Sequence, residues 1–430
     1  MDFFLHPKSM ATIITFFIIA LSILIFRVLA RKLYQKQSKK RYHPVGGTIF
    51  NQLINFNRLH DYMTDLASKH KTYRLIGPFR SEVYTSDPAN VEYILKTNFE
   101  NYGKGWYNYS LIKDLLGDGI FAVDGEKWRE QRKVSSLEFS ARALRDVSSI
   151  IFRENAVKLA NIVSEAAFAH RPMDIQELFM KSTLDSIFRV AFGVDLDSMC
   201  GSNEEGVRFS RAFDDASAIT AWRYVDIMWK IKKALNIGLE AKLKENIRII
   251  DEFVYKLIRS KIEQNEQSQN DCVESKKQDI LTRFLKLSDA DPKYLRDIIL
   301  NFDPKMCFSD DTMPDGFQVK KGDTAAYQPY AMGRMSFIWG DDAEEYKPER
   351  WIDENGCFKP ESPFKFTAFQ AGPRICLGKE FAYRQMKIIS AVLLRFFVFK
   401  LSDESKAVKY RTMINLHIDG GLSVRAIRRN

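Results

Sequence analysis

A ten-residue segment near the end of the chain contains the residue types that present a thiolate to a metal. It runs from Phe369 to Gly378 and reads Phe-Gln-Ala-Gly-Pro-Arg-Ile-Cys-Leu-Gly. A thiolate ligand needs a tight loop with backbone N–H groups directed at the sulfur, and Gly372 and Gly378 allow the backbone to pass close to a flat ring. The apolar, helical stretch that follows places Cys376 just before a helix N-terminus, where positive potential favours a thiolate. The segment therefore predicts that Cys376 is a metal ligand.

Four further side chains have types that suit a haem group bound by this cysteine. Arg374, two residues before the cysteine, can pair with a haem propionate, and Phe369 can shield the sulfur from water. Far upstream, Trp128 and Arg132 are four residues apart in a stretch with helical spacing, Gly125–Glu138, so their N–H groups can converge on one carboxylate. A lone cysteine is more often a buried structural thiol, and an aromatic–basic pair more often packs on a surface. On the residues alone, these two ordinary roles stay open beside haem binding.

The same residues resemble the motifs of a known superfamily. Residues 369–378 are similar to the cytochrome P-450 signature Phe-x-x-Gly-x-Arg-x-Cys-x-Gly, and its five fixed positions arise by chance on the order of once in ten thousand such chains. Trp128 and Arg132 stand where that superfamily holds the haem propionates, and Pro348–Trp351 is similar to its Pro-Glu-Arg-Phe box. The resemblance implies haem as the cofactor, with Cys376 as the ligand of its iron.

Three longer segments look like the plant fatty-acid omega-hydroxylase branch of this superfamily. The segments are Leu115–Phe121, Tyr330–Arg334 and Phe366–Arg374, and the resemblance covers nearly all of the chain after the N-terminal segment. It implies a monooxygenase that uses dioxygen to hydroxylate an aliphatic, fatty-acid-like substrate. It also implies that an NADPH-dependent cytochrome reductase supplies the electrons.

The resemblance also exposes a gap in the second half of the chain. The superfamily has a long central helix with an Ala-Gly-x-Asp/Glu-Thr run that delivers protons for oxygen activation, and then a Glu-x-x-Arg helix. Here Arg296–Phe302 resembles the start of such a central helix. Asp303–Cys307, in contrast, is similar to the sequence that follows the Glu-x-x-Arg helix in the superfamily. We therefore predict an internal deletion between Phe302 and Asp303, and we expect Arg350 to lack the ion-pair partners of that helix. The alternative to an active monooxygenase is a membrane-anchored, catalytically inactive form that binds haem poorly or not at all.

Composition and charge exclude several other classes of protein. With 430 residues, 45% hydrophobic and 28% charged, the chain can bury a large core but does not resemble a multi-span membrane protein. Its net charge of +10 comes mostly from residues 27–41, which include seven basic residues and no acidic one. A nucleic-acid reader would spread its positive charge over a folded domain, so no nucleic-acid partner is expected. The five cysteines are odd in number and show no Cys-x-x-Cys spacing, so neither a disulfide framework nor a zinc site is predicted.

The N-terminal segment has the length and the flanking residues of a membrane anchor. Met10–Phe26 contains no charged residue, and the apolar stretch continues to Ala30, with Arg27 able to reach the interface. A cleaved signal peptide is the alternative, but the basic cluster follows the apolar run rather than precedes it. Positive residues on the C-terminal side place that side in the cytosol. We expect a single-pass protein of the endoplasmic reticulum membrane, with an anchor and basic hinge over 1–41 and a cytosolic haem-thiolate monooxygenase domain over 42–430.

The spacing of apolar residues predicts a mainly α-helical fold with small β-sheets. This α+β arrangement corresponds to an incomplete cytochrome P-450 fold with an N-terminal transmembrane helix. Two alternating stretches, Tyr73–Ile76 and Glu82–Thr85, flank Gly77 and Pro78 and predict a hairpin. Asp87, followed by a proline, predicts the N-cap of a helix. Further helices are predicted over Gly125–Glu138, Ala141–Ala167, Met173–Phe192 and Ala241–Glu263.

Two other stretches are predicted to be non-helical. Asn265–Gln278 is polar and poor in apolar residues, which is typical of a loop. Tyr410–Ile427 alternates around Asp419, Gly420 and Gly421, which predicts a second hairpin. The expected order is therefore a small sheet, many helices and a second small sheet.

Overall fold

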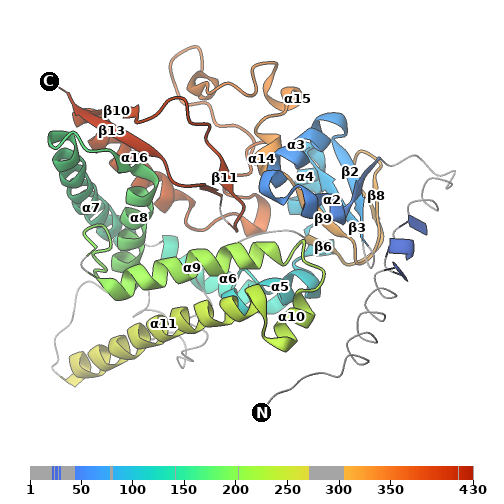
Figure 1. Ribbon diagram of the computed structural model, residues 1–430, viewed down its shortest axis with the longest axis horizontal. Helices are drawn as coiled ribbons and strands as arrows, with labels where there is room; N and C mark the ends of the chain where they lie inside the picture. Colours follow the sequence, from blue (N-terminus) through green and yellow to red (C-terminus); the bar gives the residue numbers. More distant parts are fainter. Residues whose placement is uncertain are drawn as a thin grey trace, which may run out of the picture. The chain divides into compact units, whose positions relative to one another are not determined.

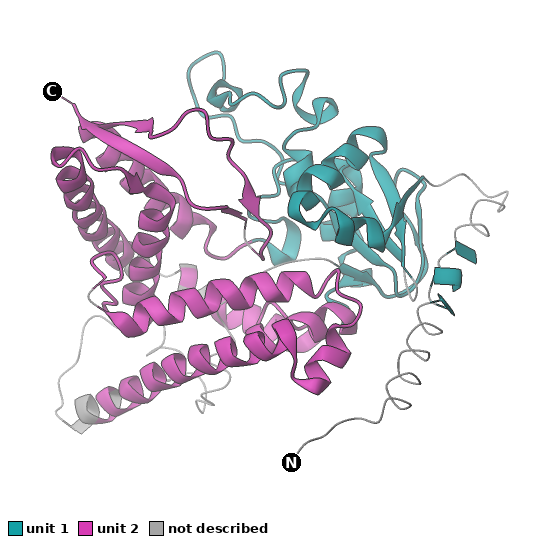
Figure 2. Ribbon diagram, in the orientation of Figure 1, with its two compact units in different colours: residues 1–105, 304–375 teal, residues 106–303, 376–430 magenta. Residues whose placement is uncertain are grey.

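The computed structural model describes most of the chain outside the N-terminal segment and one internal stretch. The described residues are 22–23, 25–27, 29–30, 44–77, 81–140, 142–201, 203–270, 305–414 and 416–429. They form two compact units, each built from segments far apart in the sequence (Figure 2). Unit 1 comprises residues 1–105 and 304–375, and unit 2 comprises residues 106–303 and 376–430. The predicted deletion point between Phe302 and Asp303 lies outside the described residues.

Unit 1 is organised around a six-stranded mixed sheet (Figure 1). The strand order is β1-β2-β3-β9-β6-β4, in which β1 is parallel to β2, β3 is parallel to β9, and the other neighbours are antiparallel. Strands from the start of the chain therefore pair with strands that follow the predicted deletion. The six strands are β1 (Val45–Thr48), β2 (Thr72–Ile76), β3 (Ser81–Thr85), β4 (Tyr102–Gly103), β6 (Lys305–Cys307) and β9 (Thr324–Tyr327).

The hairpin and the helix start predicted near the beginning of unit 1 are confirmed. β2 and β3 pair antiparallel from Thr72 opposite Thr85 to Ile76 opposite Ser81. The side chain of Asp87 accepts a hydrogen bond of 2.9 Å from the backbone N–H of Ala89, which caps the orphan amides of helix α4 (Pro88–Glu92). The chain continues through a π-helical turn, η2 (Tyr93–Thr97), and a 3-10 turn, η3 (Phe99–Asn101).

Short helices and a small hairpin complete unit 1. Met63 and Ala67 of α3 pack against Tyr73 and Leu75 of the sheet, and all four side chains are buried. The apolar side chains of β2 therefore form the surface against which α3 packs. The remaining elements of this unit are α2 (Ile49–Ile54), η1 (Phe56–Arg58), α3 (Leu59–Lys69), β7 (Asp311–Thr312), β8 (Gln318–Val319), α14 (Pro329–Met332), α15 (Ser336–Trp339), η4 (Pro348–Trp351) and η5 (Gly372–Arg374).

Unit 2 is mainly helical, as the spacing of apolar residues predicted (Figure 1). Four predicted helices are confirmed, because each combines an apolar face with a charged one at helical spacing. Three have ends within two residues of the prediction, whereas α11 continues seven residues beyond its predicted end. The helices of this unit are α5 (Gly105–Leu116), α6 (Gly125–Ser140), α7 (Arg142–Phe168), α8 (Ile175–Phe192), α9 (Glu204–Trp222), α10 (Trp229–Leu235), α11 (Gly238–Asn270) and α16 (Lys379–Phe396).

An aromatic cluster holds three of these helices together. Phe188 of α8 meets Phe209 of α9 edge-on, with ring centroids 5.6 Å apart, and Phe209 lies 4.8 Å from Phe253 of α11. Leu243 and Ile250 of α11 are buried in the same cluster. Burial of large apolar side chains is the main favourable contribution to such packing.

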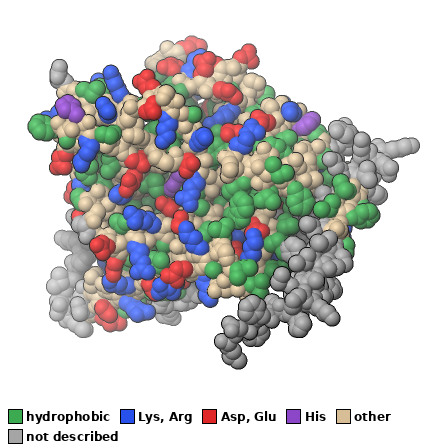
Figure 3. Space-filling model, viewed as in Figure 1, with side chains coloured by type: hydrophobic (Ala, Val, Ile, Leu, Met, Phe, Trp, Pro, Cys, Tyr) green, Lys and Arg blue, Asp and Glu red, His purple; other side chains and the backbone are tan. Residues whose placement is uncertain are grey.

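The solvent faces of α9 and α11 carry acidic and basic side chains intermixed (Figure 3). One ion pair links the two helices, and another spans one turn of α11. Lys256 lies 2.8 Å from Glu205, and Arg248 lies 2.7 Å from Glu245. Exposed pairs of this kind contribute little to stability, so the apolar faces dominate the packing.

The C-terminal hairpin was predicted with the wrong partner strand. β11 (Tyr410–Arg411) pairs with β12 (His417–Ile418), whereas β13 (Ser423–Arg428) pairs with β10 (Phe397–Leu401) and with β5 (Met173–Asp174). The turn at Asp419–Gly421 therefore leads from one sheet into another. At Gly421 a Cβ atom would overlap the carboxylate of Asp174, which accepts a 3.0 Å hydrogen bond from the N–H of Leu422. This tertiary contact directs the chain into the second sheet.

Two predictions about the remaining segments have different outcomes. The loop over Asn265–Gln278 is wrong for its first residues, because α11 continues to Asn270; glutamine and glutamate are good helix formers even without apolar neighbours. Most of the predicted anchor, Met10–Phe26, lies outside the described residues. Among the residues that are described, no helix is both long enough and apolar enough to cross a bilayer.

Candidate functional site

Cys376 lies in unit 2, just before the N-terminus of helix α16. It is half-buried and its thiol is free. Gly378 is the N-cap residue, and its carbonyl oxygen accepts a hydrogen bond of 2.8 Å from the N–H of Ala382. The sulfur is therefore held two residues before the cap of an 18-residue helix, as predicted, where the unpaired N–H groups favour negative charge.

The space beside the sulfur is kept open by Gly378. A Cβ atom at this position would lie 3.8 Å from the Sγ atom of Cys376, in van der Waals contact with it. Glycine thus leaves one side of the sulfur free of a side chain, which is the condition for a flat group to approach it.

The other described cysteines are less suited to bind a metal. Cys307 is fully buried, its thiol donates a 2.9 Å hydrogen bond to the carbonyl oxygen of Ser309, and burial raises its pKa to about 11. Cys200 and Cys357 are exposed, and Cys272 lies outside the described residues. A thiolate ligand must be both deprotonated and sheltered from water, so Cys376 is the best candidate among the cysteines that the structure describes.

The first part of the same loop belongs to unit 1, which ends at Ile375. Gly372 has φ +67°, and a Cβ atom there would lie 2.9 Å from the carbonyl carbon of Leu95 and closer still to its oxygen. Only glycine tolerates both this conformation and this approach. The backbone partner that requires glycine at this position is thus Leu95 of η2, a contact that the sequence did not reveal.

The predicted neighbours of Cys376 are divided between the two units. In unit 1, Arg374 is buried with its guanidinium 5.9 Å from the ring centroid of Phe99, and Phe369 is half-buried. In unit 2, Trp128 is buried and Arg132 is half-buried. Both of these lie on α6, where a spacing of four residues puts them on one face.

Arg350 was predicted to lack the ion-pair partners of the Glu-x-x-Arg helix, and the partner that the structure gives it is a local one. Its Nη2 atom lies 2.6 Å from Asp342, and its Nη1 atom donates a 2.8 Å hydrogen bond to the carbonyl oxygen of Trp339. Lys347 lies 2.6 Å from the same carboxylate. Hydrogen bonds from Lys347 and then Arg350 hold the pKa of Asp342 below its ordinary value. A local acid eight residues upstream thus replaces the partners expected from a distant helix.

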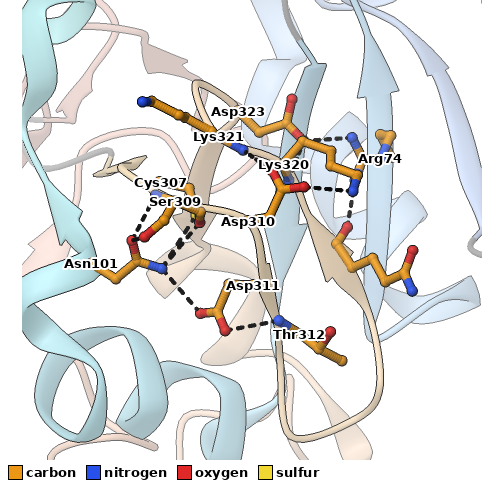
Figure 4. A network of polar contacts seen from close by, with 11 residues as sticks. Arg74, Asn101, Cys307, Ser309, Asp310, Asp311, Thr312, Lys320, Lys321 and Asp323 are labelled. Carbon is orange, nitrogen blue, oxygen red and sulfur yellow. Dashed lines mark hydrogen bonds and ion pairs between the residues drawn. The ribbon is translucent and has the colours of Figure 1, made fainter.

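A carboxylate that the sequence did not single out binds the segment of unit 1 in which Leu95 contacts Gly372. Asp311 accepts hydrogen bonds from four side chains and from the N–H of Thr312, and Figure 4 shows part of this network. Burial on its own raises the pKa of Asp311, but these hydrogen bonds, with that from Tyr102 the strongest, lower it below the ordinary value. The four side-chain donors are Tyr93 at 3.0 Å, Asn98 at 2.9 Å, Asn101 at 3.4 Å and Tyr102 at 2.8 Å.

The sequence model of the cytochrome P450 family matches the chain over residues 39–301 and 295–421. Among curated relatives, "Cytochrome P450 704C1" of Pinus taeda is 43% identical, and the alignment covers 91% of this chain and 93% of the relative. "Cytochrome P450 704B1" of Arabidopsis thaliana is 37% identical, with 92% and 96% covered. "Cytochrome P450 94A2" of Vicia sativa is 30% identical, with 98% and 99% covered. The chain therefore belongs to the cytochrome P450 family.

This family consists of haem-thiolate monooxygenases that receive electrons from a redox partner and act on small molecules, so haem is the cofactor. The described residues fit such a group. A single half-buried cysteine lies at the start of a long helix, and Gly378 leaves the space beside its sulfur open. The described residues include no cluster of three or more acidic, histidine or cysteine side chains that could hold a metal ion.

The comparisons also locate a discontinuity. The alignment with the Pinus taeda relative extends over 489 positions and that with the Vicia sativa relative over 511, although this chain has 430 residues. The relatives therefore contain residues that this chain lacks. The family model breaks into two matches at residues 295–301, directly before Phe302. Both observations agree with the deletion predicted between Phe302 and Asp303.

Proposed function

We propose that the site of Cys376 serves the monooxygenation of an aliphatic, fatty-acid-like substrate. The observation that carries this proposal is the half-buried thiol at the N-terminus of α16, with Gly378 beside its sulfur. When bound, haem supplies the activation of dioxygen that inserts one oxygen atom into a C–H bond. The chain's own contribution is a thiolate donor from Cys376 and, by family resemblance, cationic or N–H partners for the propionates from Arg374, Trp128 and Arg132.

The substrate class and the redox partner follow from the resemblance to the plant fatty-acid omega-hydroxylase branch. Relatives from three plant species align over 90% or more of their length, and their similarity supports a shared substrate class. We assign a fatty-acid-like aliphatic chain as substrate and an NADPH-dependent cytochrome reductase as the electron donor.

We further assign the N-terminal segment to the endoplasmic reticulum membrane, with residues 42–430 on the cytosolic side. The described residues of this segment are helical, and their apolar side chains are exposed, with Ile23 at 54%, Phe26 at 72% and Leu29 at 52%. Large apolar side chains in contact with water are unfavourable, whereas a bilayer would bury them. The basic cluster at 27–41 fits the cytosolic face.

A second candidate function is favoured by the discontinuity at residues 295–301. The central helix that delivers protons in this family falls within the segment that the chain lacks, and no described residue has been assigned that role. A chain without this helix is an anchored protein that holds haem poorly and does not hydroxylate. We expect this second function for the chain as it stands, and the first for a chain that contains the segment.

The test compares the chain with a version that carries the corresponding segment of the Pinus taeda relative between Phe302 and Asp303. Both are expressed with a plant reductase, supplied with long-chain fatty acids and assayed for hydroxylated products. We expect products only from the restored chain, and none from its Cys376→Ser variant. Equal turnover by the two chains would overturn the second function, and no turnover by a restored chain that binds haem would overturn the substrate assignment.

A further inference from the structure

The segment Tyr93–Tyr102 of unit 1 supports the loop that leads into Cys376. Its residue Leu95 presents its backbone carbonyl to Gly372, and the ring of Phe99 lies 5.9 Å below the guanidinium of Arg374. Ala371 and Leu95 are both fully buried in one apolar cluster. The last residues before Cys376 therefore take their position from η2 and η3.

The other side of the same segment is held by one carboxylate. Tyr93, Asn98, Asn101 and Tyr102 all donate hydrogen bonds to Asp311, at distances between 2.8 and 3.4 Å. Asp311 itself is fixed in β7, which pairs with β8, and its Oδ1 atom also accepts from the N–H of Thr312 (Figure 4). One side chain from beyond the predicted deletion thus fixes four residues of the supporting segment.

The arrangement requires a carboxylate rather than a polar side chain of the same shape. Oδ2 accepts from Asn98, Asn101 and Tyr102, and Oδ1 accepts from Tyr93 and the N–H of Thr312. An asparagine would replace one oxygen by an NH2 group, which donates and does not accept. If Oδ2 were replaced, the amide donors of Asn98 and Asn101 would face another donor, and if Oδ1 were replaced, the N–H of Thr312 would do so. Each donor in that position loses its hydrogen bond.

We propose that Asp311 is a positioning residue for the haem-thiolate loop, acting through Tyr93–Tyr102 on Gly372 and Arg374. This inference rests on the proposed role of Cys376. We assign Asp311 no contact with substrate or cofactor. Its role is to fix the conformation of the residues that precede Cys376. Loss of its hydrogen bonds releases η2 and η3, and the loop that they support then samples other conformations.

The test uses the full chain with two variants and one neighbouring control. Asp311→Asn removes the carboxylate, and Tyr102→Phe removes one of the hydroxyl groups that donate to it. Asp310→Asn is the control, because Asp310 is exposed and pairs only outside this network, with Lys320 at 2.7 Å and the N–H of Lys321 at 2.9 Å. All three changes lie in unit 1 and preserve side-chain size.

Two readouts report on the loop independently of turnover. In the haem-free chain, the rate of alkylation of Cys376 by iodoacetamide is measured by peptide mass spectrometry and divided by the rate at the exposed Cys357. In the haem-loaded chain, the fraction of ferrous carbonyl complex with thiolate-type absorption is measured among molecules that contain haem. Counting only molecules that contain haem separates this fraction from changes in the amount of loaded protein.

We expect Asp311→Asn to raise the relative alkylation rate several-fold and to lower the thiolate fraction, with a smaller change in the same direction for Tyr102→Phe and none for Asp310→Asn. If Asp311→Asn does not fold, Tyr102→Phe decides the outcome. Values for Tyr102→Phe and Asp311→Asn equal to those of the control would overturn the proposal. Thiolate-type absorption that survives Cys376→Ser would overturn the haem-ligand assignment instead, so the two failures are distinguishable.

Discussion

Arg223 donates two parallel hydrogen bonds to the carboxylate of Glu240, from Nε at 2.9 Å and from Nη2 at 2.6 Å. Both side chains are almost fully buried. Two further hydrogen bonds are made, since Nη2 lies 2.8 Å from Asp114 and Nη1 lies 2.8 Å from the carbonyl oxygen of Leu111. The guanidinium therefore joins α5, the end of α9 and the start of α11 at one point of unit 2.

Arg223→Met is expected to lower the free energy of unfolding by about 3–5 kcal/mol, because it leaves Glu240 buried without its counter-charge. Arg223→Lys is expected to restore only part of the loss, because an ammonium cannot make the bidentate contact. Denaturant unfolding measures both changes. Arg223→Met combined with Glu240→Met serves as the control and should recover most of the stability, since it removes the isolated charge. A single variant as stable as the parent chain would contradict this role for the pair.

Asp114 should make stability depend on acid pH. Burial alone raises its pKa, but hydrogen bonds from Lys233 and Arg223 lower it below the ordinary 3.8. A carboxylate with a depressed pKa in the folded state stabilises the fold above its unfolded pKa, and this contribution is lost as the pH falls through the folded pKa. We expect the free energy of unfolding to fall below about pH 4, and to fall less steeply in Asp114→Asn. Identical slopes for the two proteins would rule out this contribution.

Gly372→Ala is expected to destabilise unit 1 more than an alanine at another glycine with positive φ. Gly356 has φ +75° and open space around its Cβ position, so Gly356→Ala reports the conformational cost alone, about 1–2 kcal/mol. At Gly372 the new methyl group also overlaps the backbone of Leu95, which adds about 1–3 kcal/mol. Denaturant unfolding compares the two variants. Equal losses would mean that the Leu95 contact is loose.

Removal of residues 1–41 is expected to shift the protein from the membrane to the soluble or aggregated fraction, because it deletes the apolar run Met10–Phe26. The control is removal of residues 1–9, which leaves this run whole and should leave the protein on membranes. Carbonate-washed membranes distinguish an inserted segment from peripheral attachment. Retention of the longer truncation after that wash would show a second attachment.

Local patterns in the sequence predicted local structure well. The alternation of apolar and polar residues over 73–85 correctly predicted the β2–β3 hairpin. The type and position of Asp87 correctly predicted an N-cap. The signature around Cys376 gave its place before α16. In each case the determining contacts join residues a few positions apart, so spacing alone carries the information.

Contacts between distant segments could not be predicted in the same way. β13 follows a turn at Gly421 that packs against Asp174, far away in the sequence, and it then pairs with both β5 and β10. Asp311 gathers donors from residues 93–102, and no spacing rule connects these positions. The partner of Arg350 was missed for a different reason. The family motif implied partners on a distant helix, whereas Asp342 is only eight residues upstream.

The most direct test of the account is the absorption of the ferrous carbonyl complex in a haem-loaded preparation of Cys376→Ser. Serine cannot supply the soft anionic sulfur donor, so we predict that thiolate-type absorption disappears. Cys357→Ser, which changes an exposed cysteine of the same chain, should leave the absorption unchanged. Thiolate-type absorption that persists in Cys376→Ser would contradict the assignment of the iron ligand and, with it, the proposed function.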